Sequence, residues 1–86
     1  MIYRIKITDN ALKEYQKIND PYHTQIKTKI DHLSKTGLES TNIKALTGEF
    51  KGLYRLRVGN YRIIFDLEED TITILSILHR KDVYGK

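Results

Sequence analysis

Leu53-Tyr54-Arg55-Leu56-Arg57-Val58-Gly59-Asn60-Tyr61-Arg62-Ile63-Ile64-Phe65 consists of two alternating runs of apolar and basic residues joined by Gly59-Asn60. A two-residue link of this kind predicts a β-hairpin, because its backbone adopts the positive φ angles that tight hairpin turns need. With these two residues as the link, Val58 lies opposite Tyr61, and counting outward sets the remaining register. The expected pairs are Arg57 with Arg62, Leu56 with Ile63, Arg55 with Ile64, and Tyr54 with Phe65.

One face of this hairpin is apolar and the other is basic, because side chains alternate along a strand. The basic face gathers Arg55, Arg57 and Arg62. Like charges directly across a strand pair are destabilising, so three arginines together favour an anionic partner. The planar guanidinium fork donates two parallel hydrogen bonds to phosphate. The hairpin therefore predicts a phosphate-binding or RNA-binding face, and the alternative is a solvated sheet face with scattered basic residues. The residues expected on the apolar core face are Tyr54, Leu56, Val58, Tyr61, Ile63 and Phe65.

The length of 86 residues is enough for one small domain, over residues 1–86, and too short for two. The sequence has no cysteine, which excludes disulfides and thiolate zinc sites and favours a reducing cytoplasm. A net charge of +4 favours nucleic acid or an acidic protein as a partner. No apolar run approaches the roughly 20 residues of a membrane span, so we expect no membrane association. Ligand spacing for a metal is not visible either, and we expect no metal or other cofactor.

The rest of the chain predicts two helices and two more strands. Apolar stripes are expected at Ala11, Leu12, Tyr15 and Ile18 of the first helix, and at Tyr22, Ile26, Ile30 and Leu33 of the second. Gly37 is expected to end the second helix in a left-handed conformation. The predicted elements are a strand at 2–7, a helix capped by Thr8 or Asp9 and running to about Ile18, a helix with Asp20 as N-cap and Pro21 as first residue running to about Lys35, and a last strand at about 71–78.

The last strand is expected to pair with the second strand of the hairpin. A two-residue turn at Glu69-Asp70 would pair Phe65 with Ile74 and Ile63 with Ser76. Residues 38–50 are mixed: Glu39-Ser40-Thr41-Asn42 predicts a loop, and Lys44-Ala45-Leu46 is expected to lead back to the sheet. The fold class is therefore α+β: an N-terminal strand, a helical hairpin that covers the apolar face, and a three-stranded antiparallel meander whose basic face is open and concave.

Three segments in combination resemble the RelE/ParE toxin superfamily, and the RelE branch most closely. These segments are Leu46-Thr47-Gly48, residues 52–65, and His79-Arg80-Lys81-Asp82-Val83-Tyr84. The resemblance covers essentially the whole chain and implies a RelE-like, microbial-RNase-type fold. It also implies a toxin of a type II toxin–antitoxin system that enters the ribosomal A site and cuts mRNA without a metal. In this chemistry the ribose 2′-OH attacks the adjacent phosphate.

The resemblance also implies partners and a cytoplasmic location. The expected partners are mRNA, the 70S ribosome and a cognate antitoxin that covers the basic face. The toxin–antitoxin complex is expected to bind operator DNA through the antitoxin.

Residue roles follow from the resemblance position by position. Arg62 matches the arginine expected to hold the scissile phosphate, and Arg80 the arginine expected to stabilise its developing charge. Tyr84 matches a tyrosine expected to stack on, or hydrogen-bond to, the displaced nucleotide. Structural alternatives are that Arg62 and Arg80 pair with Asp66 or Asp82, and that Tyr84 packs the C-terminus.

The residues quoted for the resemblance do not identify the general base. Arg55 and Arg57 stand where a well-known relative has lysines, and an arginine binds phosphate but does not give up its proton. His79 and Lys44 are the two candidate proton carriers. The further candidates for phosphate binding are Lys51 and Lys81.

Two other functions fit the same resemblance. A ParE-like toxin would inhibit DNA gyrase by protein binding, without nuclease chemistry. A weakly active homologue would serve as an antitoxin-binding module, which the arginines at positions 55 and 57 make possible.

Overall fold

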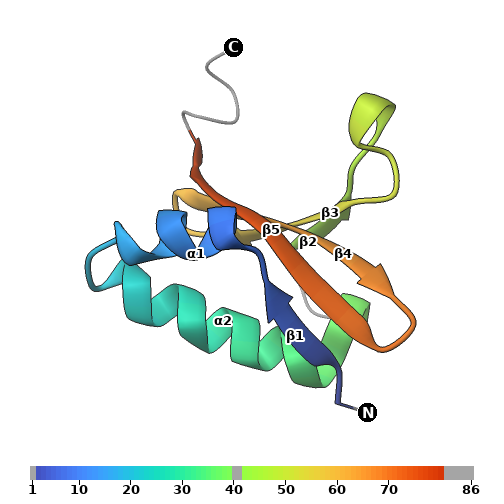
Figure 1. The fold of residues 1–86 in the computed structure, drawn as a ribbon, viewed down its shortest axis with the longest axis horizontal. Helices are drawn as coiled ribbons and strands as arrows, with labels where there is room; N and C mark the ends of the chain where they lie inside the picture. Colours follow the sequence, from blue (N-terminus) through green and yellow to red (C-terminus); the bar gives the residue numbers. More distant parts are fainter. Residues whose placement is uncertain (1, 40–41, 81–86) are drawn as a thin grey trace.

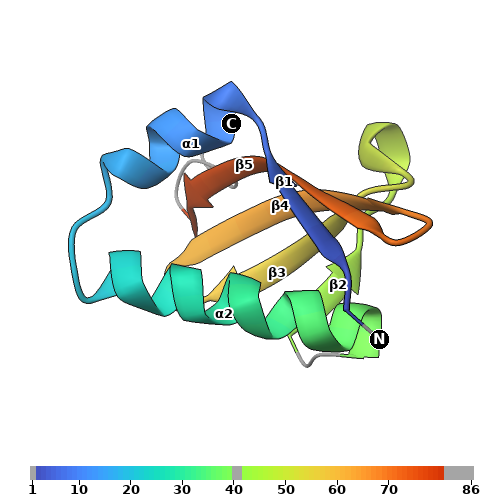
Figure 2. The same cartoon turned by 60° about the horizontal axis from the view of Figure 1, so that its bottom comes forward.

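The computed structural model describes residues 2–39 and 42–80. Within these residues the chain forms a five-stranded sheet in the order β1-β5-β4-β3-β2, with two helices packed on one face (Figure 1, Figure 2). β1 runs parallel to β5, and the other neighbouring strands are antiparallel. The elements are β1 (Arg4–Ile7), α1 (Asp9–Gln16), α2 (Tyr22–Thr36), β2 (Ile43–Ala45), β3 (Tyr54–Val58), β4 (Tyr61–Glu68) and β5 (Thr71–His79), with short 3-10 turns η1 (Gly37–Glu39) and η2 (Gly48–Phe50).

The α+β prediction is confirmed, with one addition. β2 overlaps the segment that was expected to lead back to the sheet, but it is itself a strand, and it pairs Lys44 with Arg55 at the edge of the sheet. Three residues are too few for an alternating pattern to be recognised, so the strand is defined by its partner and not by its own sequence.

The first hairpin has the predicted register, from Val58 opposite Tyr61 to Tyr54 opposite Phe65. Gly59 has a φ of +58°, while Asn60 keeps a negative φ. A positive φ at the first turn position alone is the pattern of a type II′ turn, which favours glycine there.

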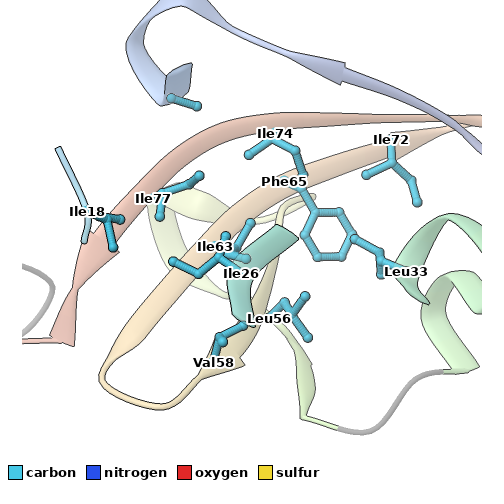
Figure 3. Close-up of a cluster of buried hydrophobic side chains, with 11 residues drawn as sticks. Ile18, Ile26, Leu33, Leu56, Val58, Ile63, Phe65, Ile72, Ile74 and Ile77 are labelled. Carbon is cyan, nitrogen blue, oxygen red and sulfur yellow. The ribbon is translucent and has the colours of Figure 1, made fainter. Parts of the chain in front are cut away.

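The core lies between the apolar face of the sheet and the two helices, as Figure 3 shows. Phe65, Ile63, Ile26 and Leu33 are fully buried. The prediction for the helix stripes is wrong at one position in each helix: Leu12 is 40% exposed and Tyr22 36% exposed. The remaining core side chains are Ala11, Ile18, Leu56, Val58, Ile72, Ile74 and Ile77.

Both helices begin close to their predicted caps. Thr8 is the N-cap of α1, and its Oγ1 accepts from the Ala11 N–H at 3.1 Å. α1 ends at Gln16, two residues before the expected Ile18, and α2 begins at Tyr22, one residue after the expected Pro21. The Asp20 carboxylate still serves the second helix, because it accepts from the Thr24 hydroxyl at 2.6 Å and the Thr24 N–H at 3.0 Å.

These hydrogen bonds, the hydroxyl bond first, hold the pKa of Asp20 below its usual value. A carboxyl whose folded pKa is depressed stabilises the fold above its unfolded pKa. That contribution is lost as the pH falls through the folded pKa.

The end of α2 packs against the N-terminal segment. Gly37 has the predicted positive φ, +57°, although its ψ of −138° lies outside the left-handed helical region. The Tyr3 N–H donates to the Ser34 carbonyl at 2.6 Å, and the Tyr3 ring lies against Gly37. This close approach leaves no room for a side chain at position 37.

The second hairpin differs from its predicted register. Phe65 pairs with Ile74 as expected, but Ile63 pairs with Ile77 and not with Ser76. The register shifts by one between Ile64 and Phe65, because Leu75 is an extra residue in β5 and forms a β-bulge. The sequence does carry a sign of it: the buried residues of β5 are Ile72, Ile74 and Ile77, and the last interval is three residues.

The turn of this second hairpin contains a strained residue. Glu69 has a φ of +57°, which costs a side-chain-bearing residue energy. We expect Glu69→Gly to raise the free energy of unfolding by about 0.5–1 kcal/mol, the strain relieved less the added freedom of the unfolded chain. Urea denaturation measures it. Asp70→Gly is the control, since Asp70 has a negative φ; an equal gain there would contradict the strain argument.

Among residues 2–39 and 42–80, no helix is long and apolar enough to cross a membrane.

Candidate nucleic-acid interface

Basic side chains gather on the sheet face away from the helices. The strand register places Lys44 opposite Arg55, and Arg57 opposite Arg62. Directly paired residues have Cβ atoms about 5 Å apart, so Arg57 and Arg62 are close neighbours. The two pairs occupy neighbouring rows of this face, near the turn at Gly59.

Arg62 is the buried member of this group, with 5% of its surface exposed. Its Nη1 donates to the Gly59 and Tyr61 carbonyl oxygens, each at 3.0 Å. These bonds direct the guanidinium toward the hairpin turn and away from Asp66, which pairs with Thr73 farther along β4. Among the described residues, Arg62 is therefore bonded to the turn backbone and does not pair with Asp66.

The other cations of the face are more accessible. Arg57 and Lys44 are exposed, and Arg55 is half-buried. Arg57 thus presents its guanidinium to solvent beside the fixed guanidinium of Arg62. An anion that approached this face would meet one preorganised arginine and one adaptable arginine.

Arg80 joins this group from the end of β5. Its backbone N–H donates to the Asn60 carbonyl at 2.6 Å, which brings it beside the hairpin turn. Leu78, two residues earlier, pairs with Arg62. Arg80 directly follows His79, the last residue of β5, and it is exposed. If the alternation of β5 is extended by this one residue, Arg80 falls on the face of Leu78 and Arg62.

His79 lies on the other face of the sheet. It pairs with Tyr61, and the two rings meet edge to face with centroids 5.3 Å apart. The Tyr61 ring also contacts Tyr22 of α2, at 5.4 Å. The bulge at Leu75 is the reason: it shifts the alternation of β5, so that His79 joins the helix-covered face and Leu78 the basic face. Of the two candidate proton carriers, only Lys44 is placed with the arginines.

The remaining candidates are less closely placed. Lys51 follows η2 and is exposed. The η2 segment rises beside the sheet on the side away from α2, at the other end of β3 from the hairpin turn (Figure 1). Tyr84 and Lys81, and with them Asp82, lie outside the described residues.

Sequence reasoning missed two residues that organise this region. Asn10 and Glu14 of α1 hydrogen-bond to β5 at the bulge. The sequence gives no sign of these contacts. The hydrophobic period of α1 identifies only its buried stripe and does not predict polar contacts to a strand more than 60 residues away.

The described chain offers no cluster of three or more His, Asp or Glu side chains that could hold a metal. The basic face combines the buried guanidinium of Arg62 with the exposed side chains of Arg57 and Lys44. Such a group binds phosphate and stabilises negative charge that develops on it.

Comparison with known proteins decides the family. The profile of the family described as "ParE toxin of type II toxin-antitoxin system, parDE" matches residues 5–84. The chain belongs to this family. It is a toxin of a type II toxin–antitoxin system, within the wider RelE/ParE group.

Relatives with the RelE name support the same placement. This toxin is 46% identical over 43 residues to Toxin RelE3 of Methanocaldococcus jannaschii, a match that covers 50% of this chain and 48% of that protein. The matched part is thus about half the length of that relative.

Solved toxin structures share the whole fold. The RelB–RelE antitoxin–toxin complex from Methanococcus jannaschii matches with a TM-score of 0.79 and 29% identity, covering 93% of this chain and 95% of that one. The RelBE2 complex from Mycobacterium tuberculosis matches with a TM-score of 0.81 over 93% of this chain and 100% of that one. Its identity is 24%, so it supports the fold alone.

Proposed function

We propose that this toxin is an endoribonuclease that cuts mRNA in the ribosomal A site and so inhibits translation in the cytoplasm. The observation that carries the proposal is the Arg57–Arg62 pair, with Arg62 buried and held by two turn carbonyls and with Arg80 beside the same turn. A fold that fixes like charges side by side gains from an anion between them. The RelE names of its relatives favour RNA as the source of that anion.

The proposed reaction is an internal transfer at one phosphodiester. The 2′-oxygen forms a bond to phosphorus and the bond from phosphorus to the 5′-oxygen breaks, which leaves a 2′,3′-cyclic phosphate and a 5′-OH. One proton leaves the 2′-OH and one is taken up by the 5′-oxygen. Arg62 and Arg80 are proposed to stabilise the extra charge on the phosphate oxygens, and Arg55 and Arg57 to bind the flanking backbone.

The proton that leaves the 2′-OH needs an acceptor other than an arginine. Lys44 is the candidate on the basic face, opposite Arg55. His79 is not proposed for this step, since it packs against Tyr61 on the other face. Orientation of the 2′-oxygen in line with the leaving oxygen would supply much of the rate, and Tyr84 is proposed to hold the displaced nucleotide.

The regulatory partner is proposed to be a cognate antitoxin that covers the basic face. Solved relatives are named as RelB–RelE and RelBE2 complexes, which supports a protein partner of this kind. We further propose that the antitoxin carries the complex to operator DNA.

The second candidate function is inhibition of DNA gyrase. It is favoured by one observation, the match to a family profile described as ParE toxin. The arginine group distinguishes the two, because a gyrase inhibitor that acts by protein binding needs no preorganised phosphate site.

The deciding experiment offers the purified toxin two targets. Primer extension on mRNA bound to programmed ribosomes is expected to show discrete cuts within A-site codons, and gyrase supercoiling is expected to stay unchanged. If the mRNA stays uncut and supercoiling is inhibited, the toxin is a gyrase inhibitor and not an endoribonuclease. Neither effect, with antitoxin binding retained, would make the chain a binding module.

Phosphate binding by Arg57 has its own salt signature. We expect Arg57→Ala to weaken binding to a short single-stranded RNA and to reduce the slope of log K against log salt by about 0.7, the value of one phosphate contact. Fluorescence anisotropy between about 50 and 200 mM salt measures it. Lys29→Ala is the charge-matched control, since Lys29 is exposed on α2. An equal change in both variants would mean that net charge, and not the basic face, controls binding.

A further inference from the structure

The bulge in β5 determines which residues reach the basic face. Between the turn and Phe65, β4 and β5 pair so that Ile72 and Ile74 face the core. If this register continued without the extra residue, Ser76, Leu78 and Arg80 would follow Ile74 onto the helix-covered face. With Leu75 inserted, Ile77 faces the core instead and Leu78 pairs with Arg62. Extending the alternation one residue past His79 puts Arg80, whose N–H bonds to the Asn60 carbonyl, on the face of Arg62.

Side chains of α1 hold the bulged backbone. β1 pairs with β5 only as far as Ile74, so β1 does not satisfy the edge of β5 beyond that point. There the Leu75 carbonyl accepts from Thr8 Oγ1 and from Asn10 Nδ2, each at 3.2 Å. The Ile77 N–H donates to Glu14 Oε1 at 2.9 Å. α1 thus takes the place of a neighbouring strand.

Asn10 links these bonds into one group. Its Nδ2 also lies 3.3 Å from Ser76 Oγ and 3.3 Å from Glu14 Oε1. The carboxylate of Glu14 therefore receives hydrogen bonds both from α1 and from β5. A bond to a charged acceptor is stronger than a neutral one, which makes Glu14 the dominant member of the group.

We propose that Glu14, assisted by Asn10, is a positioning residue for the nuclease: it fixes the bulge at Leu75 and so sets Arg80 beside Arg62. This inference rests on the proposed function, because it assigns a purpose to the placement of Arg80. Burial of Ile77 favours the same register, so loss of Glu14 loosens the end of β5 and leaves the rest of the sheet in place.

The test compares Glu14→Ala with Glu14→Gln in the full chain. The amide oxygen of glutamine still accepts from the Ile77 N–H, whereas alanine does not. We expect Glu14→Ala to lower kcat for cleavage on programmed ribosomes about tenfold, as for loss of one hydrogen bond to a charged group. KM should change little, because Arg80 acts on the developing charge. Glu14→Gln should recover most of kcat.

Two NMR signals report the placement independently of activity. In Glu14→Ala the Ile77 amide should exchange at least about tenfold faster than in the native protein. The NOE between the Tyr61 and His79 rings should weaken, because it depends on the bulged register. Asp9→Ala is the control: it removes another carboxylate of α1, and Asp9 makes no hydrogen bond to β5 among the described residues.

The outcomes separate this inference from the proposed function. Normal Ile77 exchange and a normal NOE in Glu14→Ala would overturn it, and so would disturbed signals with native kcat. The proposed function fails if the native protein does not cleave mRNA, or if Arg80→Ala cleaves it at the native rate. The nuclease role of Glu14 then fails as well. The NMR signals would then still decide whether Glu14 holds the bulge. Should Glu14→Ala not fold, Asn10→Ala, on an exposed residue, gives the same test with smaller shifts.

Discussion

Arg62→Ala is expected to slow mRNA cleavage on programmed ribosomes by about 100-fold to 1,000-fold, the effect of removing one preorganised donor at a developing charge. The fold fixes the geometry of Arg62 through the Gly59 and Tyr61 carbonyls. A donor that is already oriented costs no reorganisation when the phosphate gains charge. Single-turnover cleavage measures the effect, because it isolates the chemical step from release of the ribosome.

Two variants make this result specific. Arg62→Lys keeps the charge but lacks the planar fork that donates in two directions, so it should recover only part of the rate. Arg4→Ala removes an exposed arginine at the β1 edge, opposite Thr71, and should leave the rate within about twofold, as distant surface substitutions do. A native rate in Arg62→Ala, with the fold intact by circular dichroism, would remove Arg62 from the site.

Gly37→Ala is expected to lower the free energy of unfolding by about 2–4 kcal/mol, the sum of backbone strain and overpacking. The φ of +57° disfavours any side chain. An added Cβ would also lie 2.6 Å from Cε2 of Tyr3, closer than real Cβ contacts allow. The Tyr3 ring packs against the core, and its N–H is bonded to Ser34, so it has little freedom to move aside.

Urea denaturation of four variants, Gly37→Ala, Gly48→Ala, Tyr3→Ala and the double variant at positions 3 and 37, separates the two costs. Gly48 has a φ of +67°, and a Cβ added there would meet nothing within 4 Å, so Gly48→Ala reports strain alone, about 1 kcal/mol. Combining Gly37→Ala with Tyr3→Ala should remove the steric part, making the pair less than additive. Equal losses for Gly37→Ala and Gly48→Ala would refute the contact with Tyr3.

Local sequence predicted the parts of this fold that local sequence controls. The Gly59-Asn60 link fixed the register of β3 with β4, because turn type and loop length determine hairpin pairing. The hydrophobic period located both helices, although Leu12 and Tyr22 proved to lie at the exposed margins of their stripes. The basic face followed directly from alternation about that turn.

The errors share a physical cause. The bulge at Leu75 is stabilised by contacts with α1, and the hairpin sequence carries only a weak sign of it, the three-residue interval between Ile74 and Ile77. A one-residue shift changes the face of every residue beyond it. That shift is why Ile63 pairs with Ile77 and why His79 lies with Tyr61. The sequence therefore predicted that these residues form a strand, but not which face of the sheet the side chains after Leu75 occupy.

The parallel pairing of β1 with β5 has a consequence for synthesis of the chain. Arg4 pairs with Thr71, and β5 lies in the sheet between β1 and β4. A nascent chain that has not yet released β5 from the exit tunnel leaves both of those strands without their shared neighbour. Contacts of such long sequence separation form late and slowly. The β3–β4 hairpin, with Arg57 and Arg62 paired, can form from local sequence before β5 leaves the tunnel. The order of translation thus makes the contact of Arg80 with Asn60 a late step, after the hairpin that receives it.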